Sequence, residues 1–194
     1  TPGTAWRYRM HIRNAPGTYW YHSHSAAQVG DGAFGFFVVH PKGTLSNATA
    51  AKATSTSTAA TFANDHTLAV SAWWWRDQVS LMAQWMAFSK GLHPEHHDHM
   101  FFMEMKSVLM NGKGRSTACT NPAACPLHVI EGKKGDTIRI RFLSSCSPVP
   151  FVLSIEDHNF TIVSMDGRDV QPKTVSSILL ETGGCYDVLV KLNL

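Results

Sequence analysis

The sequence predicts an all-β protein, built as a sandwich or barrel of short strands. Residues 6–12 alternate apolar with basic side chains, as expected of a half-buried strand. Ile138, Ile140 and Phe142 alternate with arginines in the same way. Short apolar runs bounded by turn residues recur along the rest of the chain, a spacing typical of sandwiches.

The expected elements follow in order. The first unit, residues 1–43, has strands at 6–12, 18–24 and 34–40. Residues 44–65 are rich in Ser, Thr and Ala and predict a linker. The second unit, residues 66–194, opens with a strand at 67–75 and a short helix at 76–90, where Val79, Met82 and Met86 recur at helical spacing. Turns are expected at 111–112 and 134–136, with further strands at 138–142, 152–155, 160–163, 177–180 and 186–192.

Composition limits the function classes. The chain has 194 residues, of which 44% are hydrophobic and 16% charged, enough to fill a core. A net charge of +3 is too small and dispersed to indicate nucleic-acid binding. No apolar run approaches the ~20 residues of a membrane-spanning helix. Histidine, with 11 residues, stands out and points to metal chemistry.

The strongest motif is the run 17–24, which reads Gly-Thr-Tyr-Trp-Tyr-His-Ser-His. Residues i and i+2 of a strand point to the same face, so His22 and His24 are expected side by side. Imidazole is a ligand for copper, zinc, iron and nickel. The plain alternative is two polar residues on a solvated strand face, and for an isolated His-x-His that alternative is the stronger.

The surroundings of this motif change that balance. After His24 come Gln28, Asp31-Gly32, Gly35 and an apolar strand, and the run 17–41 resembles the second copper-binding segment of the multicopper oxidases, the family of laccases, ascorbate oxidase and ferroxidases. The second unit resembles the second domain of that family in the same order, at residues 109–114, 135–141, 157–160, 165–167, 171–172 and 183–188.

The resemblance implies a cupredoxin-like Greek-key β-sandwich fold in two partial domains. It implies that His22 and His24 each bind one copper of a type 3 pair within a trinuclear centre. It also suggests a role for Asp31 in orienting an imidazole or moving protons, with a plain Asp-Gly turn as the alternative. The implied reaction couples one-electron oxidation of a phenol, an aromatic amine, ascorbate or a metal ion to reduction of O2 to water.

Other parts of the family pattern are expected outside this chain. No cysteine is flanked by histidines, so the type 1 copper and the remaining cupredoxin domains would belong to a longer protein or assembly, and this chain alone would be inactive. The alternative is a non-catalytic copper-binding or scaffold subunit. Fungal laccases carry a cysteine at the position of Gly30, and it pairs with a cysteine of the second domain. Cys146 resembles that second cysteine. Ser147 stands where they carry an acidic residue that touches the phenol.

Further candidates lie elsewhere. His93, His96, His97 and His99, with methionines nearby, form a second possible metal site, although a solvated loop is the simpler interpretation. Sequons at Asn47 and Asn159 and an even number of cysteines predict a secreted glycoprotein. Cys119 and Cys125 are close enough in sequence for a local loop, Cys185 is a possible partner of Cys146, and the pairing of the four is left open.

Overall fold

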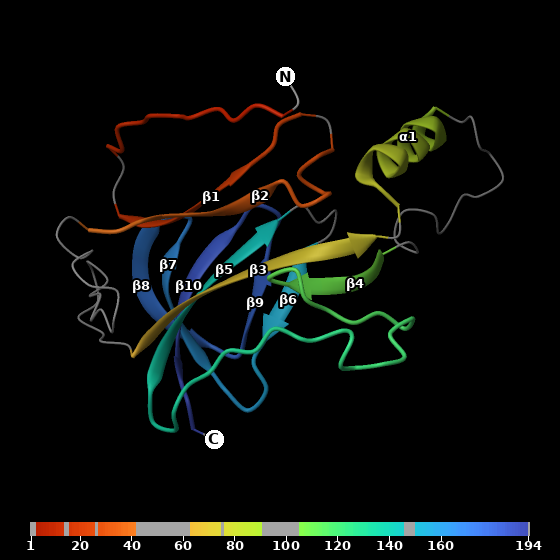
Figure 1. Cartoon of the computed structure of the whole chain (residues 1–194). Coiled ribbons are helices and arrows are strands. Elements are labelled where there is room, and N and C mark those ends of the chain that lie inside the picture. Colours follow the sequence, from red (N-terminus) through yellow and green to blue (C-terminus); the bar gives the residue numbers. More distant parts are fainter. Residues whose placement is uncertain are drawn as a thin grey trace.

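The computed structural model describes residues 3–13, 16–25, 27–41, 63–74, 76–90, 105–145 and 150–193. In the first unit, β1 (Gly17–His22) pairs antiparallel with β2 (Phe34–Val39) over six residues. In the second unit, β3 (Asn64–Trp74) begins two residues ahead of the expected boundary at residue 66. Figure 1 shows β1 and β2 lying across one side of the second unit.

The second unit is organised around a six-stranded sheet with the order β4-β3-β5-β10-β7-β8. Its strands besides β3 are β4 (Met105–Met110), β5 (Thr137–Ser145), β7 (Phe160–Met165), β8 (Arg168–Val175) and β10 (Cys185–Lys191). The neighbours β3 and β5 are parallel and the other neighbours are antiparallel. This mixed order requires crossover connections, as in Greek-key sandwiches.

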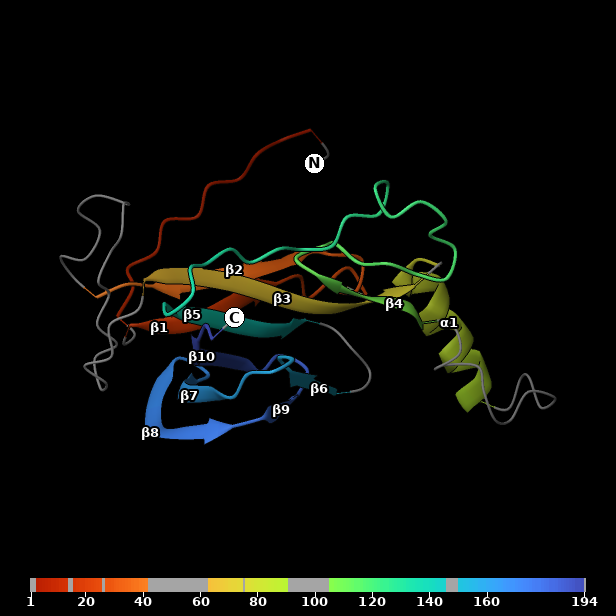
Figure 2. The same ribbon diagram turned by 90° about the horizontal axis from the view of Figure 1, so that it is seen from below.

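A smaller layer closes one face of this sheet. Strands β6 (Phe151–Ser154) and β9 (Ser177–Leu180) pair antiparallel, and Figure 2 shows them together on the side of the molecule away from β2. The core between the layers is apolar, with Phe142, Phe160, Leu180 and Val188 at most 1% exposed. Alternate residues of the strands supply it, which is the packing of a sandwich. The expected all-β sandwich is therefore confirmed.

The first unit covers the opposite face of the same sheet. Trp20, Phe34 and Phe36 pack against a small cluster that Ala69, Leu143 and Cys185 form on β3, β5 and β10. Because both faces are covered, eight of the nine residues of β5 are buried. Strand β5 is thus an interior strand, although its sequence alternates apolar and basic residues.

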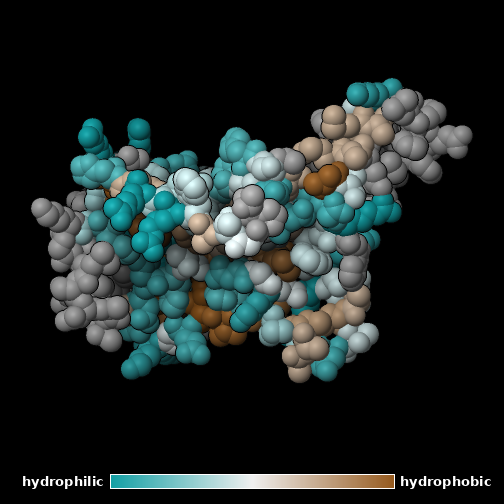
Figure 3. All heavy atoms as spheres, turned by 45° about the horizontal axis from the view of Figure 1, so that its top comes forward, coloured by the Kyte–Doolittle hydropathy of each residue, from teal (hydrophilic) through white to brown (hydrophobic). Residues whose placement is uncertain are grey.

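The one helix of the described residues, α1 (Gln78–Ser89), is confirmed near its expected position. Asp77 begins it, since its carboxylate accepts hydrogen bonds from the Ser80 backbone N–H at 2.8 Å and from the Ser80 hydroxyl at 2.7 Å. These bonds favour the ionised form and lower the pKa of Asp77. Figure 1 shows α1 projecting from the sheets, and its side chains Val79, Met82 and Met86 are exposed. Figure 3 shows hydrophobic surface at the upper right, over the region of the helix.

The prediction of a strand at residues 6–12 is wrong. Residues 4–13 have no strand assignment, and Figure 2 shows them running apart from the sheets. Trp6 and Tyr8 are 81% and 77% exposed, so these apolar side chains of the alternation are not packed into a core. A strand needs hydrogen bonds from a neighbouring strand, which alternation alone does not supply.

Among the described residues, no helix is both long enough and apolar enough to cross a lipid bilayer.

Candidate functional site

The two histidines of the motif lie next to each other at the end of β1. His22 is the last residue of the strand and His24 lies two residues beyond it. Their ring centroids are 4.9 Å apart, with the ring planes tilted by 33°. The Ser23 backbone N–H donates to the Ala33 carbonyl at 2.8 Å, which extends the pairing with β2 past the strand end. The expected juxtaposition of the imidazoles is therefore found.

A hydrogen bond orients the ring of His22. Its Nδ1 lies 3.0 Å from the Ser23 backbone carbonyl. A carbonyl oxygen accepts and cannot donate, so the neutral imidazole carries its proton on Nδ1 and has the lone pair on Nε2. Metal-binding histidines in proteins are commonly held in this way, with one nitrogen on a carbonyl and the other on the metal.

Trp20 supports the same ring from the side. The indole and imidazole are stacked, with centroids 4.2 Å apart and planes at 21°. Trp20 itself packs against the cluster of Ala69, Leu143 and Cys185 on the second unit's sheet. The orientation of His22 is thereby tied to a residue that rests on the second unit.

The loop after the histidines is anchored to the helix. Asp31 accepts a hydrogen bond from the Gln78 backbone N–H at 2.9 Å, across the two units. A Cβ on Gly30 would lie 2.3 Å from Gln78 Cγ, so the loop and the first helical residue are in close contact. The hydrogen bond that the structure gives Asp31 therefore runs to α1, and a role toward an imidazole stays a prediction.

Several other candidates lie outside the described residues. These are His93, His96, His97, His99, Asn47, Cys146 and Ser147. Asn159 is described, and it is exposed in the turn ahead of β7. Within the described ranges, no group of three or more His, Cys, Asp or Glu side chains is placed to hold a metal ion. The described part of the chain therefore offers a pair of imidazoles to a metal and not a complete ligand set.

A charged cluster lies on the sheet face that the first unit covers, with two arginines and Asp187 buried and Asp65 at its exposed edge. We call Asp65, Arg139, Arg141 and Asp187 the Arg141 cluster. Arg141 donates from Nε to Asp65 Oδ1 at 2.9 Å, from Nη2 to Asp65 Oδ2 at 2.9 Å, and from Nη1 to Asp187 Oδ2 at 3.0 Å. Arg139 also donates to both carboxylate oxygens of Asp65. The two positive and two negative charges balance.

Burial dominates the electrostatics of this cluster. The two arginines and Asp187 are at most 5% exposed. Removal from water raises the pKa of Asp187 and of Asp65, and the Arg141 guanidinium offsets this rise only in part. Thr18 of β1, 1% exposed, reaches the same cluster, because Arg141 Nη1 donates to its hydroxyl oxygen. Sequence reasoning missed this cluster, although the arginines of the alternation at 138–142 were its signal.

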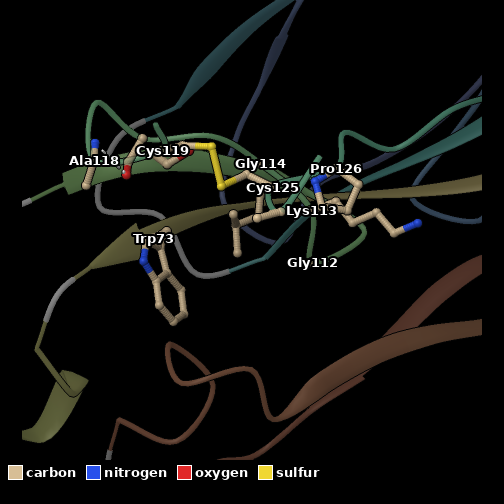
Figure 4. Close-up of a pocket in the computed structure, with 12 residues that line it drawn as sticks. Trp73, Gly112, Lys113, Gly114, Ala118, Cys119, Cys125 and Pro126 are labelled. Carbon is tan, nitrogen blue, oxygen red and sulfur yellow. Dashed lines mark hydrogen bonds between the residues drawn. A yellow bond between two sulfur atoms is a disulfide. The ribbon is translucent and has the colours of Figure 1, made fainter. Parts of the chain in front are cut away.

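Cysteine pairing is partly settled. Cys119 and Cys125 form a disulfide, as one of the sequence alternatives had it. Cys185 is a free thiol, 2% exposed, and burial followed by the nearby Asp166 and Asp187 carboxylates raises its pKa to about 12. The disulfide lines an open pocket of about 440 Å³ together with Trp73, Lys113 and Pro126. In Figure 4 the Trp73 ring points away from the disulfide and Lys113 extends away from Trp73, so the lining side chains do not converge on one point.

Comparison with protein families identifies both units. Residues 64–194 match the family model "Multicopper oxidase", and residues 1–44 match a second model with the same description. The two matches leave out only residues 45–63, which lie within the expected linker at 44–65.

Laccases are among the similar curated proteins. A laccase of Trametes maxima is 31% identical over 194 residues, which is all of this chain and 33% of that protein. Laccase-2 of Cryptococcus neoformans var. grubii is 26% identical, with 97% of this chain and 30% of that protein covered. The chain thus spans about a third of the length of these relatives.

Solved structures share the fold at lower identity. Fet3p, titled a multicopper oxidase that functions in iron import, has a TM-score of 0.66 at 20% identity, covering 92% of this chain and 28% of that one. A laccase from Botrytis aclada has a TM-score of 0.62 at 22% identity, covering 93% of this chain and 30% of that one.

Proposed function

This chain belongs to the multicopper oxidase family, and from that premise we propose that it is part of a laccase-like oxidase in which His22 and His24 each bind one copper of a type 3 pair. The pairing of two imidazoles at the end of β1, 4.9 Å apart, is the observation that carries the proposal. The other ligands of a trinuclear centre, the type 1 copper and the remaining cupredoxin domains would be supplied from outside the described residues.

The donor set fits copper. Imidazole nitrogen is a preferred ligand of copper, and His22 has Nε2 available because Nδ1 faces the Ser23 carbonyl. The rings lie side by side, which suits one metal between them or two neighbouring metals. Copper held by these two imidazoles would supply one-electron redox chemistry toward O2.

The chain's own residues would hold the ligands in place. The Ser23 carbonyl fixes the proton on Nδ1 of His22, and the Trp20 indole restricts rotation of the ring. A ligand whose rotamer is already set loses less entropy on binding the metal. His24 is exposed and extends the pair beyond the strand end.

The reducing substrate of the whole protein is proposed as a class. Relatives are named laccases, and the structural neighbour Fet3p is titled as functioning in iron import, so a phenol, an aromatic amine or a metal ion is the expected reductant, with O2 as the acceptor and water as the product. The Cys119–Cys125 disulfide and the exposed sequon at Asn159 support a secreted glycoprotein.

Copper analysis of the full-length protein tests the assignment. His22→Ala and His24→Ala should each lower the copper content and abolish O2 consumption with a phenol, an aromatic amine or ferrous ion as reductant. His11→Ala, at an exposed histidine outside the motif, is the matched control and should change neither. Retention of full copper and activity in both motif variants would overturn the proposal. Copper binding without O2 consumption in the wild-type protein would favour a scaffold subunit instead.

A further inference from the structure

We propose that Arg141, acting through Thr18, is a positioning residue for the histidine pair: the buried Arg141 cluster holds β1 in one register on the second unit, and that register places His22 for copper. This inference rests on the proposed function of His22 and His24. Arg141 and His22 belong to different units and are not in contact, so the coupling runs through β1.

The first step is the orientation of the Arg141 guanidinium group. All three of its guanidinium nitrogens are engaged, with Asp65 on Nε and Nη2 and with Asp187 and the Thr18 hydroxyl on Nη1. The guanidinium is a rigid planar fork, so the carboxylates on its sides fix the direction of the Nη1 donor. The Thr18 side chain also favours the ionised form of Asp187, so the hydroxyl lies beside both charged groups that Arg141 Nη1 joins. Because the Nη1 donor has a fixed direction, the Thr18 hydroxyl can accept from it at only one position on the sheet.

The second step is transmission along the strand. Thr18, Trp20 and His22 share one face of β1, because side chains alternate along a strand. Thr18 meets Arg141, Trp20 meets Leu143 and Cys185, and His22 stacks on Trp20. The distance from Thr18 to His22 along a strand is about 13 Å, and six paired residues of β2 stiffen it. A shift at Thr18 therefore moves the ring of His22.

The third step is that neighbouring contacts permit a single register. A Cβ on Gly17 would lie 2.6 Å from the Gly167 carbonyl oxygen, and the Tyr19 hydroxyl donates to that same oxygen at 3.4 Å. A one-residue slip would turn Tyr19 toward Arg141 and expel Thr18 and Trp20 from the interface. The buried charges would then lose the hydroxyl that joins them. Buried polar groups that set a register are a known use of such costly interactions.

The test uses the full-length protein loaded with copper and measures copper affinity, by competition with a chelator, and the near-ultraviolet band of the copper centre. Thr18→Val removes the hydroxyl at nearly constant volume and should weaken copper binding ~10-fold or more, with loss of the near-ultraviolet band. Thr18→Ser retains the hydroxyl and should restore both. If the valine variant does not fold, Thr18→Ala removes the same hydroxyl and is measured in its place.

A stability control separates positioning from general destabilisation. Leu153→Ala lies in the sandwich core on the far side of the sheet, away from β1, and should lower the midpoint of unfolding while copper affinity stays unchanged. Equal copper affinity in Thr18→Val and the wild-type protein overturns the inference, and so does an equal loss in Leu153→Ala. His22→Ala is measured in parallel. If it retains copper, the proposed function itself fails, whereas copper loss in His22→Ala with normal binding in Thr18→Val removes only the positioning role.

Discussion

The two faces of the six-stranded sheet are both covered around β5, yet they are covered by different chemistry. The face toward β6 and β9 is closed by apolar side chains such as Phe142 and Leu180. The face toward β1 and β2 combines a small apolar cluster with the Arg141 cluster. Apolar contacts are non-directional and tolerate repacking, whereas buried ion pairs require defined partners. The difference indicates that one face holds the second unit together and the other specifies how the first unit sits on it.

The largest effect is expected from Arg141→Ala. Loss of this side chain leaves the buried Asp187 without its ion pair and Thr18 without its donor, so the free energy of unfolding should fall by about 3–5 kcal/mol. Denaturant unfolding of the full-length protein measures this. Arg168→Ala, at an exposed arginine on β8, is the control and should change stability by less than about 0.5 kcal/mol. Similar losses in the two variants would contradict the distinction between the faces.

On the apolar face, Leu180→Ala should lower the free energy of unfolding by about 2–4 kcal/mol, since it opens a cavity at a residue that is 0% exposed. Leu180→Met, which nearly conserves the volume, should cost less than about 1.5 kcal/mol. Chemical denaturation of both variants measures the two losses in the free energy of unfolding. By contrast, Arg141→Lys on the other face should remain costly, because an ammonium cannot reproduce the planar fork. A small loss of stability in Arg141→Lys would contradict the contrast between the two faces of the sheet.

Gly17→Ala tests how closely the first unit sits on the second. The new Cβ would meet Gly167 backbone atoms at 2.6–2.9 Å, and backbone cannot move aside as a flexible side chain can. We expect the free energy of unfolding to fall by about 1–3 kcal/mol and protease cleavage near β1 to increase. Gly112→Ala is a useful contrast, because nothing lies within 4 Å of that Cβ and the strain comes from its φ of +75° alone. Wild-type behaviour of Gly17→Ala would show that the contact has room to relax.

The smallest effect concerns Cys185, which lies at the interface of the two units. With its pKa raised to about 12, the thiol should resist alkylation at pH 8 in the native protein and react once the protein is unfolded. The folded-state pKa exceeds the unfolded value of 9.0, so this group's contribution to stability is complete below pH 9 and is lost as pH rises toward 12. Mass spectrometry after iodoacetamide treatment measures the modification. Rapid alkylation of the native protein would show that the interface opens.

Much of the fold and the histidine pair followed from local patterns. The alternation and short strand runs predicted the sandwich, the spacing of Val79, Met82 and Met86 predicted α1, and His-x-His predicted adjacent imidazoles. Strand β8 was not predicted, because its polar run with Pro172 carries no apolar alternation and lies at the sheet edge beside β7. The same alternation rule failed at residues 6–12, where no described strand pairs with them.

What the sequence by itself determined is local: most of the strands, a helix within residues 76–90, and that His22 and His24 share a strand face. These depend on side-chain periodicity and on turn and cap chemistry within a few residues. Only the tertiary structure decided that Arg139 and Arg141 are buried and that Arg141 donates a hydrogen bond to Thr18. Alternation tells which face of a strand a residue occupies, but whether water or another part of the chain covers that face depends on contacts between residues more than a hundred positions apart, such as Thr18 and Arg141.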